Sequence, residues 1–176
     1  VVGVGNIGTQ VLRKAKTFDM TLLGNDIITI DPKFIKEVGV EMVSLPELME
    51  RSDYISINCD LNPTSFHLIN ELQLKNVRSG AILINTARGP IVHEEALVTA
   101  LQSGRLGGAA LDVFEVEPLP LTSPLLKMEN VMLAPHNSNS SPTAWEHVHM
   151  NTLKNLADGL GISTRGIPAF KDLKRK

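Results

Sequence analysis

The first eight residues, Val1–Gly8, constrain the fold more than any other stretch. Two β-branched residues lead into Gly3-x-Gly5-x-x-Gly8, and apolar residues then recur at helical spacings through Ala15. Strand, glycine turn and helix in this order are what a dinucleotide-binding motif requires. Gly3 would allow the tight turn, Gly5 would let the backbone approach a pyrophosphate, and Gly8 would let the helix lie close to the strand. The helix N-terminus would offer N–H groups to the phosphates. A simple Gly-rich turn between a strand and a helix is the alternative.

Strand-like and helical segments alternate along the whole chain. Besides the first strand, we expect strands at residues 21–24, 41–43, 54–58, 81–85, 107–112 and 131–134. We expect helices at about residues 7–18, after Ser44, and at 93–103 and 142–160. Residues 27–39 are less regular, and Pro32 is expected to interrupt them. Repeated strand–helix units predict an α/β fold, a Rossmann-type doubly wound parallel sheet with helices on both faces.

The bulk properties exclude several classes of protein. The 176 residues are 43% hydrophobic, their net charge is −2, and no basic stripe is present, so neither nucleic-acid nor membrane-surface binding is indicated. No apolar run approaches the roughly 18 residues that a membrane helix needs. Cys59 is the single cysteine, which excludes an internal disulfide framework and favours a reducing, cytoplasmic compartment. We predict no metal site.

Asp26 is the first candidate for a cofactor-specific contact. It ends the second expected strand and lies 18 residues after Gly8, where an acidic residue binds the ribose hydroxyls of the cofactor. A carboxylate there repels a 2′-phosphate, so NAD is favoured over NADP. The alternative is Asp31, which precedes Pro32 and could equally form an Asx turn.

Charged side chains follow three further strands. Arg88 comes after the most apolar strand, Asp112 ends the next and is followed by Glu115 and Glu117, and His136 follows the last. Carboxyl ends of parallel strands share one edge of the sheet, and ligands bind at that edge. A guanidinium group there can hold a substrate carboxylate through two hydrogen bonds. The convergence of Arg, Glu and His favours catalysis over a structural histidine.

These residues lie in five stretches that resemble one family. The stretches are residues 2–8, 59–64, 84–89, 110–118 and 134–136. In order and spacing they resemble the NAD-binding domain of the D-isomer-specific 2-hydroxyacid dehydrogenases, over about residues 1–160. The resemblance implies that residues 161–176 are a remnant of the substrate domain and that the N-terminal part of that domain is absent. It also implies a homodimer in the full-length protein, and an isolated chain that is inactive.

The resemblance implies a role for each site residue. The implied cofactor-binding residues are Gly3, Gly5, Asn6, Ile7, Gly8, Asp26, Cys59, Thr86, Ala87, Arg88, Asp112 and His136. Arg88, Glu117 and His136 are the implied catalytic residues: Arg88 binds the substrate, His136 is the acid/base, and Glu117 is its partner. The family spaces this glutamate five residues after the aspartate, which selects Glu117 over Glu115. The implied reaction is hydride transfer between NAD(H) and a small 2-oxo or 2-hydroxy acid.

The chain departs from the family pattern in places that leave alternatives open. Residues 58–60 replace the usual His-x-Pro, Asn6 stands where Arg is common, and residues 137–141 differ in the segment that approaches the nicotinamide. The substrate therefore stays undetermined. An NAD-sensing regulator on the same scaffold, as in the C-terminal-binding-protein corepressors, is the alternative function. An unrelated Rossmann protein such as a methyltransferase has no use for Arg88, Glu117 and His136 in this order.

Overall fold

The computed structural model describes residues 1–138 and 140–163. The chain divides into two compact units, residues 1–136 and a second unit that begins at Asn137. The second unit contains helix α6 (Pro142–Gly159), whose first turn is capped by the Ser141 hydroxyl accepting from the N–H of Ala144 at 3.1 Å. This confirms the helix expected at 142–160. Most of the tail predicted for 161–176 lies outside the described residues.

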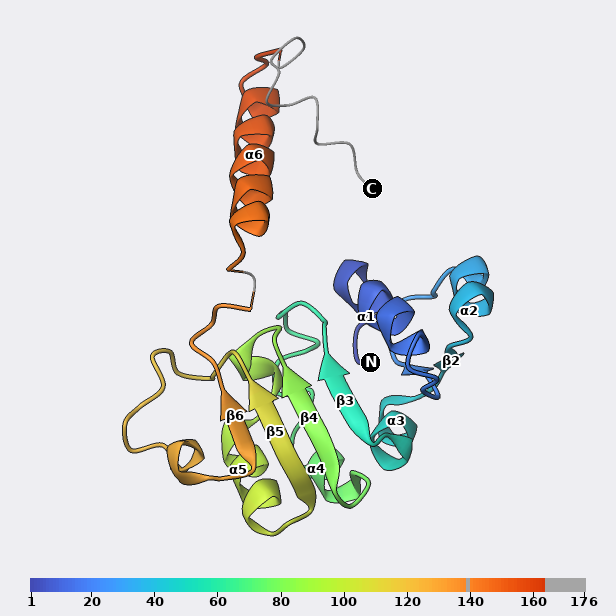
Figure 1. The fold of residues 1–176 in the computed structure, drawn as a ribbon, viewed down its shortest axis with the longest axis vertical. Coiled ribbons are helices and arrows are strands. Elements are labelled where there is room, and N and C mark those ends of the chain that lie inside the picture. The colour runs from blue at the N-terminus through green and yellow to red at the C-terminus, as the bar shows by residue number, and fades with distance from the viewer. Residues whose placement is uncertain (139, 164–176) are drawn as a thin grey trace. The chain divides into compact units, whose positions relative to one another are not determined.

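Parallel strands form the centre of the first unit (Figure 1). One sheet contains, in spatial order, β3 (Tyr54–Ile57), β4 (Ala81–Asn85), β5 (Leu106–Leu111) and β6 (Val131–Leu133). A smaller sheet pairs β1 (Leu23–Gly24) with β2 (Glu41–Met42). Val2 forms parallel bridges to Asn25 and to Ile57, so it links the two sheets. The expected first strand is thus a single bridging residue, and the parallel Rossmann-type α/β class is confirmed.

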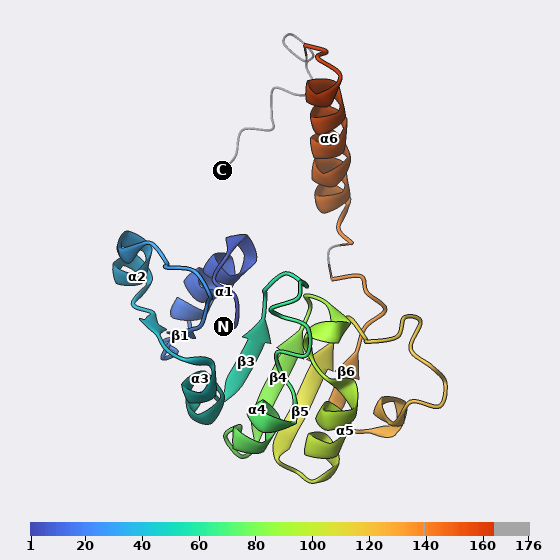
Figure 2. The same ribbon diagram turned by 180° about the vertical axis from the view of Figure 1, so that it is seen from behind.

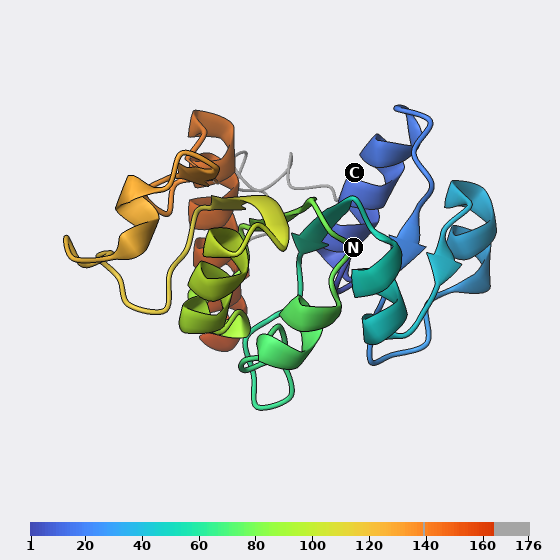
Figure 3. The same ribbon diagram turned by 90° about the horizontal axis from the view of Figure 1, so that it is seen from below.

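Helices connect these strands. They are α1 (Asn6–Lys16), α2 (Pro32–Val38), α3 (Leu45–Arg51), α4 (Glu71–Asn76) and α5 (Glu94–Gln102), with short 3-10 turns η1 (Gly89–Ile91) and η2 (Pro124–Lys127). Seen from behind, α4 and α5 lie in front of the β3–β6 sheet (Figure 2), and the view from below shows α3 on the same side (Figure 3). Helix α4 packs against both α3 and α5. These helices therefore cover one face of the sheet.

Two apolar clusters stabilise the unit. The larger joins the sheet to α3–α5 and includes Ile55 and Leu83, both fully buried. The smaller joins α1 and α2 to the first strands through Leu12 and Phe34. Burying each such side chain contributes about 1.5–3 kcal/mol. This packing fixes the strand ends that carry the site.

Two local features differ from the expectations. Pro32 begins α2 instead of interrupting residues 27–39, because a proline is tolerated in the first helical turn and Asp31 caps the helix by accepting from the N–H of Lys33 at 2.9 Å. Helix α4 was not expected at all. It begins after Asn70, whose side chain accepts from the N–H of Leu72 at 2.9 Å as part of a capping box.

Candidate cofactor and active site

The glycine turn at residues 3–8 has the geometry that its sequence predicts. Gly3 has a φ of +85°, and a Cβ there would lie 2.5 Å from the backbone nitrogen of Cys59. A Cβ on Gly8 would lie 1.9 Å from the carbonyl oxygen of Gly3. A Cβ on Gly5 would come within 4 Å of no residue in the described part of the chain other than its own chain neighbours. Gly3 and Gly8 are therefore required by the protein's own packing, whereas Gly5 leaves open space beside the turn.

The start of α1 is open to an anionic ligand. Residues Gly5, Asn6 and Ile7 are exposed, and the N-cap position is held by Gly5, which has no side chain to form a capping hydrogen bond. The N–H groups there and the positive end of the helix dipole point out of the turn. The turn thus fits the pyrophosphate of a dinucleotide, although Asn6 brings no positive charge.

Asp26 lies against the glycine turn. Its Oδ2 accepts from the N–H of Val4 at 2.7 Å, and its Oδ1 accepts from the N–H of Ile28 at 3.1 Å. Asp31 instead caps α2. Of the two candidates, the structure brings Asp26 to the turn, where a ribose next to the pyrophosphate would reach it.

A pocket of about 330 Å³ brings five of the predicted residues together. These are Ile7, Cys59, Thr86, Ala87 and Arg88. Asn58, Asp60 and Leu61 also line this pocket, and we had not predicted them as site residues. Their position directly after β3, at the edge of the sheet where ligands bind, is the sequence feature that could have identified them. Burial, together with the charges of Asp26 and Asp60, raises the pKa of the Cys59 thiol, which favours its neutral form.

Asn85 organises the turn that carries Arg88. Its buried side chain accepts from the N–H of Ala87 and donates to the carbonyl of Arg88, both at 3.0 Å. Gly89 follows, and a Cβ there would lie 1.8 Å from the carbonyl oxygen of Phe114. The Arg88 turn is therefore pressed against the loop after β5, while the Arg88 side chain is exposed. Sequence reasoning missed this role of Asn85.

Glu117 is held in the loop after β5. The loop begins at Asp112, which is buried and whose N–H donates to the carbonyl of Asn85 at 3.0 Å. Glu117 Oε1 accepts from the N–H of Phe114 at 3.0 Å. One oxygen of the carboxylate is thus fixed by its own loop, and the other faces the end of β6.

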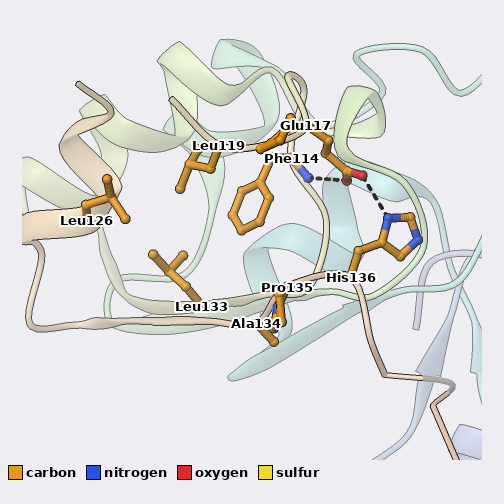
Figure 4. Close-up of a pocket in the computed structure, with 9 residues that line it drawn as sticks. Phe114, Glu117, Leu119, Leu126, Leu133, Ala134, Pro135 and His136 are labelled. Carbon is orange, nitrogen blue, oxygen red and sulfur yellow. Dashed lines mark hydrogen bonds and ion pairs between the residues drawn. The ribbon is translucent and has the colours of Figure 1, made fainter. Parts of the chain in front are cut away.

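His136 completes the site from the end of β6. Its Nδ1–H donates to Glu117 Oε2 at 2.8 Å (Figure 4). The pKa of Glu117 lies below its ordinary value of 4.5, first because of this hydrogen bond, then because of the Phe114 N–H, with a smaller contribution from the charge of Arg88. His136 has a φ of +54°, a costly conformation that concentrates at functional sites. The structure therefore places His136 against Glu117, whereas Glu115 contacts His67.

The free edge of the His136 ring points away from an apolar pocket. That pocket, about 610 Å³, is lined by Phe114, Glu117, Pro118, Leu119, Leu126, Leu133, Ala134, Pro135 and His136. Figure 4 shows Nε2 on the side of the ring opposite Glu117 and opposite the apolar side chains. Nδ1 is engaged by Glu117, and Nε2 lies at the edge of the ring that faces away from the apolar side chains.

Fold and site together define a Rossmann-type dinucleotide-binding domain with an Arg, a Glu and a His at its ligand-binding edge. Residues 1–138 match the family described as "D-isomer specific 2-hydroxyacid dehydrogenase, NAD binding domain". The chain belongs to this family, and NAD is the cofactor that such a domain binds. The glycine turn and Asp26 fit that cofactor.

Relatives extend the comparison. A glyoxylate reductase of Korarchaeum cryptofilum is 48% identical over 141 residues, which are 80% of this chain and 42% of that protein. The holo form of Rhodotorula graminis D-mandelate dehydrogenase has a TM-score of 0.84 at 35% identity, over 89% of this chain and 46% of that one. A D-isomer-specific 2-hydroxyacid dehydrogenase of Xanthobacter autotrophicus, in complex with NADPH and MES, has a TM-score of 0.77 at 31% identity, over 93% of this chain and 67% of that one. The chain thus spans less than half the length of the curated relative.

Two kinds of feature are absent from the part of the chain that the structure describes. Residues 1–138 and 140–163 contain no group of three or more His, Cys, Asp or Glu side chains placed to hold a metal ion. Within the same residues, no helix combines the length and apolar character needed to cross a membrane.

Proposed function

We propose that the protein is an NAD-dependent oxidoreductase that transfers a hydride between NAD(H) and a D-2-hydroxy acid/2-oxo acid pair. The observation that carries this proposal is the 2.8 Å contact between His136, after β6, and Glu117, after β5. Strand β5 lies between β6 and β4, and β4 carries Arg88 at its end. An acid/base pair beside a guanidinium group suits reduction of a carbonyl next to a carboxylate.

The cofactor contacts follow from the glycine turn. The open space at Gly5 and the uncapped start of α1 support pyrophosphate binding there. Asp26, held against Val4, supports a contact to the ribose hydroxyls and a preference for NAD over NADP. Ile7, Cys59, Thr86 and Ala87, which line one pocket with Arg88, would continue the cofactor site, and Asp112 would face the nicotinamide side.

The chain's own residues supply substrate binding and proton transfer. NADH, when bound, supplies the hydride to the carbonyl carbon. Arg88 would hold the substrate carboxylate through two parallel hydrogen bonds and would stabilise negative charge on the carbonyl oxygen. His136 would donate a proton to that oxygen from Nε2, while Glu117 holds the ring through Nδ1 and balances its positive charge. In the oxidation direction, neutral His136 would accept the proton.

The test is NADH oxidation by the protein at its native length. Glyoxylate, hydroxypyruvate, pyruvate and phosphohydroxypyruvate are the substrates, and acetaldehyde is the matched control for pyruvate because it lacks the carboxylate. We expect turnover with at least one 2-oxo acid and none with acetaldehyde. NADH binding without turnover of any acid would contradict the proposal and favour an NAD-sensing regulator.

Domain organisation, assembly and location belong to the same proposal. We propose that residues 1–160 are the cofactor domain, that 161–176 belong to a substrate domain, and that the chain alone binds NAD without turnover. Its length relative to its relatives supports this. The single Cys59 supports action in the cytoplasm. A homodimer is supported by the family resemblance, and apolar side chains exposed on α6, Trp145 among them, offer surface for contacts.

A further inference from the structure

Glu115 joins three loops at the carboxyl edge of the sheet. Its Oε1 forms an ion pair with Nε2 of His67, in the loop after β3. Its Oε2 accepts from the N–H of Glu94, at the start of α5, at 2.9 Å. The N–H of Glu115 donates back to Glu94 Oε2 at 3.2 Å. Glu115 itself belongs to the loop after β5, so this one residue ties together the segments that follow β3, β4 and β5 (Figure 1).

This cluster is more shielded than the His136–Glu117 pair. The side chains of His67 and Glu115 are 29% and 25% exposed, against 45% and 37% for His136 and Glu117. Ion pairs gain strength as water is excluded from them. The His67 ring is also fixed by packing, because it stacks on Phe66 at 4.0 Å. The cluster is therefore a partly buried anchor, whereas the His136–Glu117 pair is more exposed.

The anchor leads directly to the residues of the site. Glu115 is two residues before Glu117, and the residue that precedes it, Phe114, donates its N–H to Glu117 Oε1 at 3.0 Å. The carbonyl of Phe114 lies against Gly89, where a Cβ would come within 1.8 Å, so the turn after Arg88 rests on the peptide that joins Phe114 to Glu115. A shift of Glu115 would move the Phe114 peptide, and with it the carboxylate that holds His136.

We propose that Glu115 is a positioning residue, which ties the loop of Glu117 to His67 and Glu94 so that Glu117 stays in place against His136. Among the described contacts of Glu115, none reaches His136 or Arg88, so it acts through the backbone and not on the substrate. The catalytic consequence rests on the proposed function; the positioning itself does not.

The test compares two substitutions of Glu115 with a matched control. Glu115→Ala removes both side-chain contacts. Glu115→Gln removes the charge but keeps an oxygen for the N–H of Glu94 and an amide that can hydrogen-bond neutral His67. Glu95→Ala removes a neighbouring exposed carboxylate on α5 as the control. Each variant is made in the protein at its native length. Amide hydrogen exchange and steady-state NADH oxidation are measured.

We expect a local effect that splits kcat from cofactor binding. Glu115→Ala should speed exchange of the Phe114 amide by about tenfold or more while the Leu83 amide in β4 stays protected. Its kcat should fall by about tenfold, because small misplacements of catalytic groups cost such factors, and the Kd of NADH should stay within about twofold. Glu115→Gln should restore most of the Phe114 protection and most of the kcat. Glu95→Ala should match the wild type in both measurements.

Three results would overturn the proposal. They are unchanged Phe114 exchange in Glu115→Ala, equal acceleration at Phe114 and Leu83, or a Glu115→Gln variant no better than Glu115→Ala. If Glu115→Ala does not fold, His67→Ala replaces it: this variant removes the ion pair and the ring contact with Phe66 but keeps the hydrogen bonds between Glu115 and Glu94. Unaltered Phe114 exchange in His67→Ala would equally refute the idea. Absence of turnover in the wild type would refute the proposed function alone, because the exchange measurements do not depend on activity.

Discussion

Two alanine substitutions in the glycine turn should separate stability from cofactor binding. In Gly8→Ala, the new Cβ would lie 1.9 Å from the carbonyl oxygen of Gly3, whereas real contacts of a Cβ are not closer than 3.0 Å. The backbone must therefore shift by about 1.1 Å at the junction of the first strand and α1. Overpacking of this kind costs about 3 kcal/mol, which lowers the Tm of a chain of this length by roughly 10 °C.

Gly5→Ala should behave in the opposite way. Apart from its chain neighbours, no described residue lies within 4 Å of its Cβ, and its φ of −78° suits alanine. The free energy of unfolding should therefore change by less than about 1 kcal/mol. The methyl group occupies the space that a pyrophosphate would use, so the Kd of NADH should rise at least about tenfold, or about 1.4 kcal/mol.

Urea denaturation and fluorescence titration with NADH measure the two quantities on the same samples. Gly8→Ala with wild-type stability would refute the packing argument. Gly5→Ala with wild-type NADH affinity would refute the placement of the pyrophosphate.

Three further predictions concern single side chains. His136→Ala should lower kcat by about 10²–10⁴-fold, because it removes the acid/base, and leave the Kd of NADH within about twofold; collapsed cofactor binding with intact turnover would reverse the assigned roles. Carbon-13 NMR should find the pKa of Glu117 below 4.5, and in His136→Ala it should move toward 4.5, because the hydrogen bond that favours the charged form is lost. The contribution of the His136–Glu117 pair to stability is accordingly present above pH 4.5 and lost as the pH falls through the lowered pKa of Glu117. A pKa of Glu117 that is the same in His136→Ala as in the wild type would contradict this. Asp26→Asn should bring the Kd values of NADH and NADPH closer together, whereas Asp31→Ala should cost about 1 kcal/mol of stability through its lost helix cap and leave their ratio unchanged; equal affinities in the wild type would refute the role of Asp26.

The sequence predicts the sheet well because its strands are apolar runs with polar residues directly after them. The strand at 81–85 was predicted at its observed bounds, and Asp26, Arg88 and His136 were placed at strand ends for this reason. Gly8 was also predictable, because a close helix–strand contact excludes any side chain there. Local pattern and strand-end position therefore carry most of the fold and the core of the site.

The missed features depend on contacts that local patterns do not encode. Pro32 breaks a helix in its interior but begins one in the first turn, and only the cap by Asp31 distinguishes the two cases. His67 and Glu115 are 48 positions apart in the sequence, so their spacing does not predict the ion pair. Asn85 looks like the polar end of a strand, and its role emerges only when both of its hydrogen bonds to the Arg88 turn are seen.

Direct observation of hydride transfer tests the central claim. The protein at its native length is incubated with NADH that carries two deuterium atoms at C4 and, in separate samples, with glyoxylate, hydroxypyruvate, pyruvate and phosphohydroxypyruvate, and the products are examined by mass spectrometry and proton NMR. We predict that at least one of these acids yields a 2-hydroxy acid with one deuterium at C2, and that His136→Ala yields no such product over the same time. If the wild type binds the labelled NADH but no 2-oxo acid acquires deuterium, the assignment of Arg88, Glu117 and His136 to hydride-transfer chemistry is wrong.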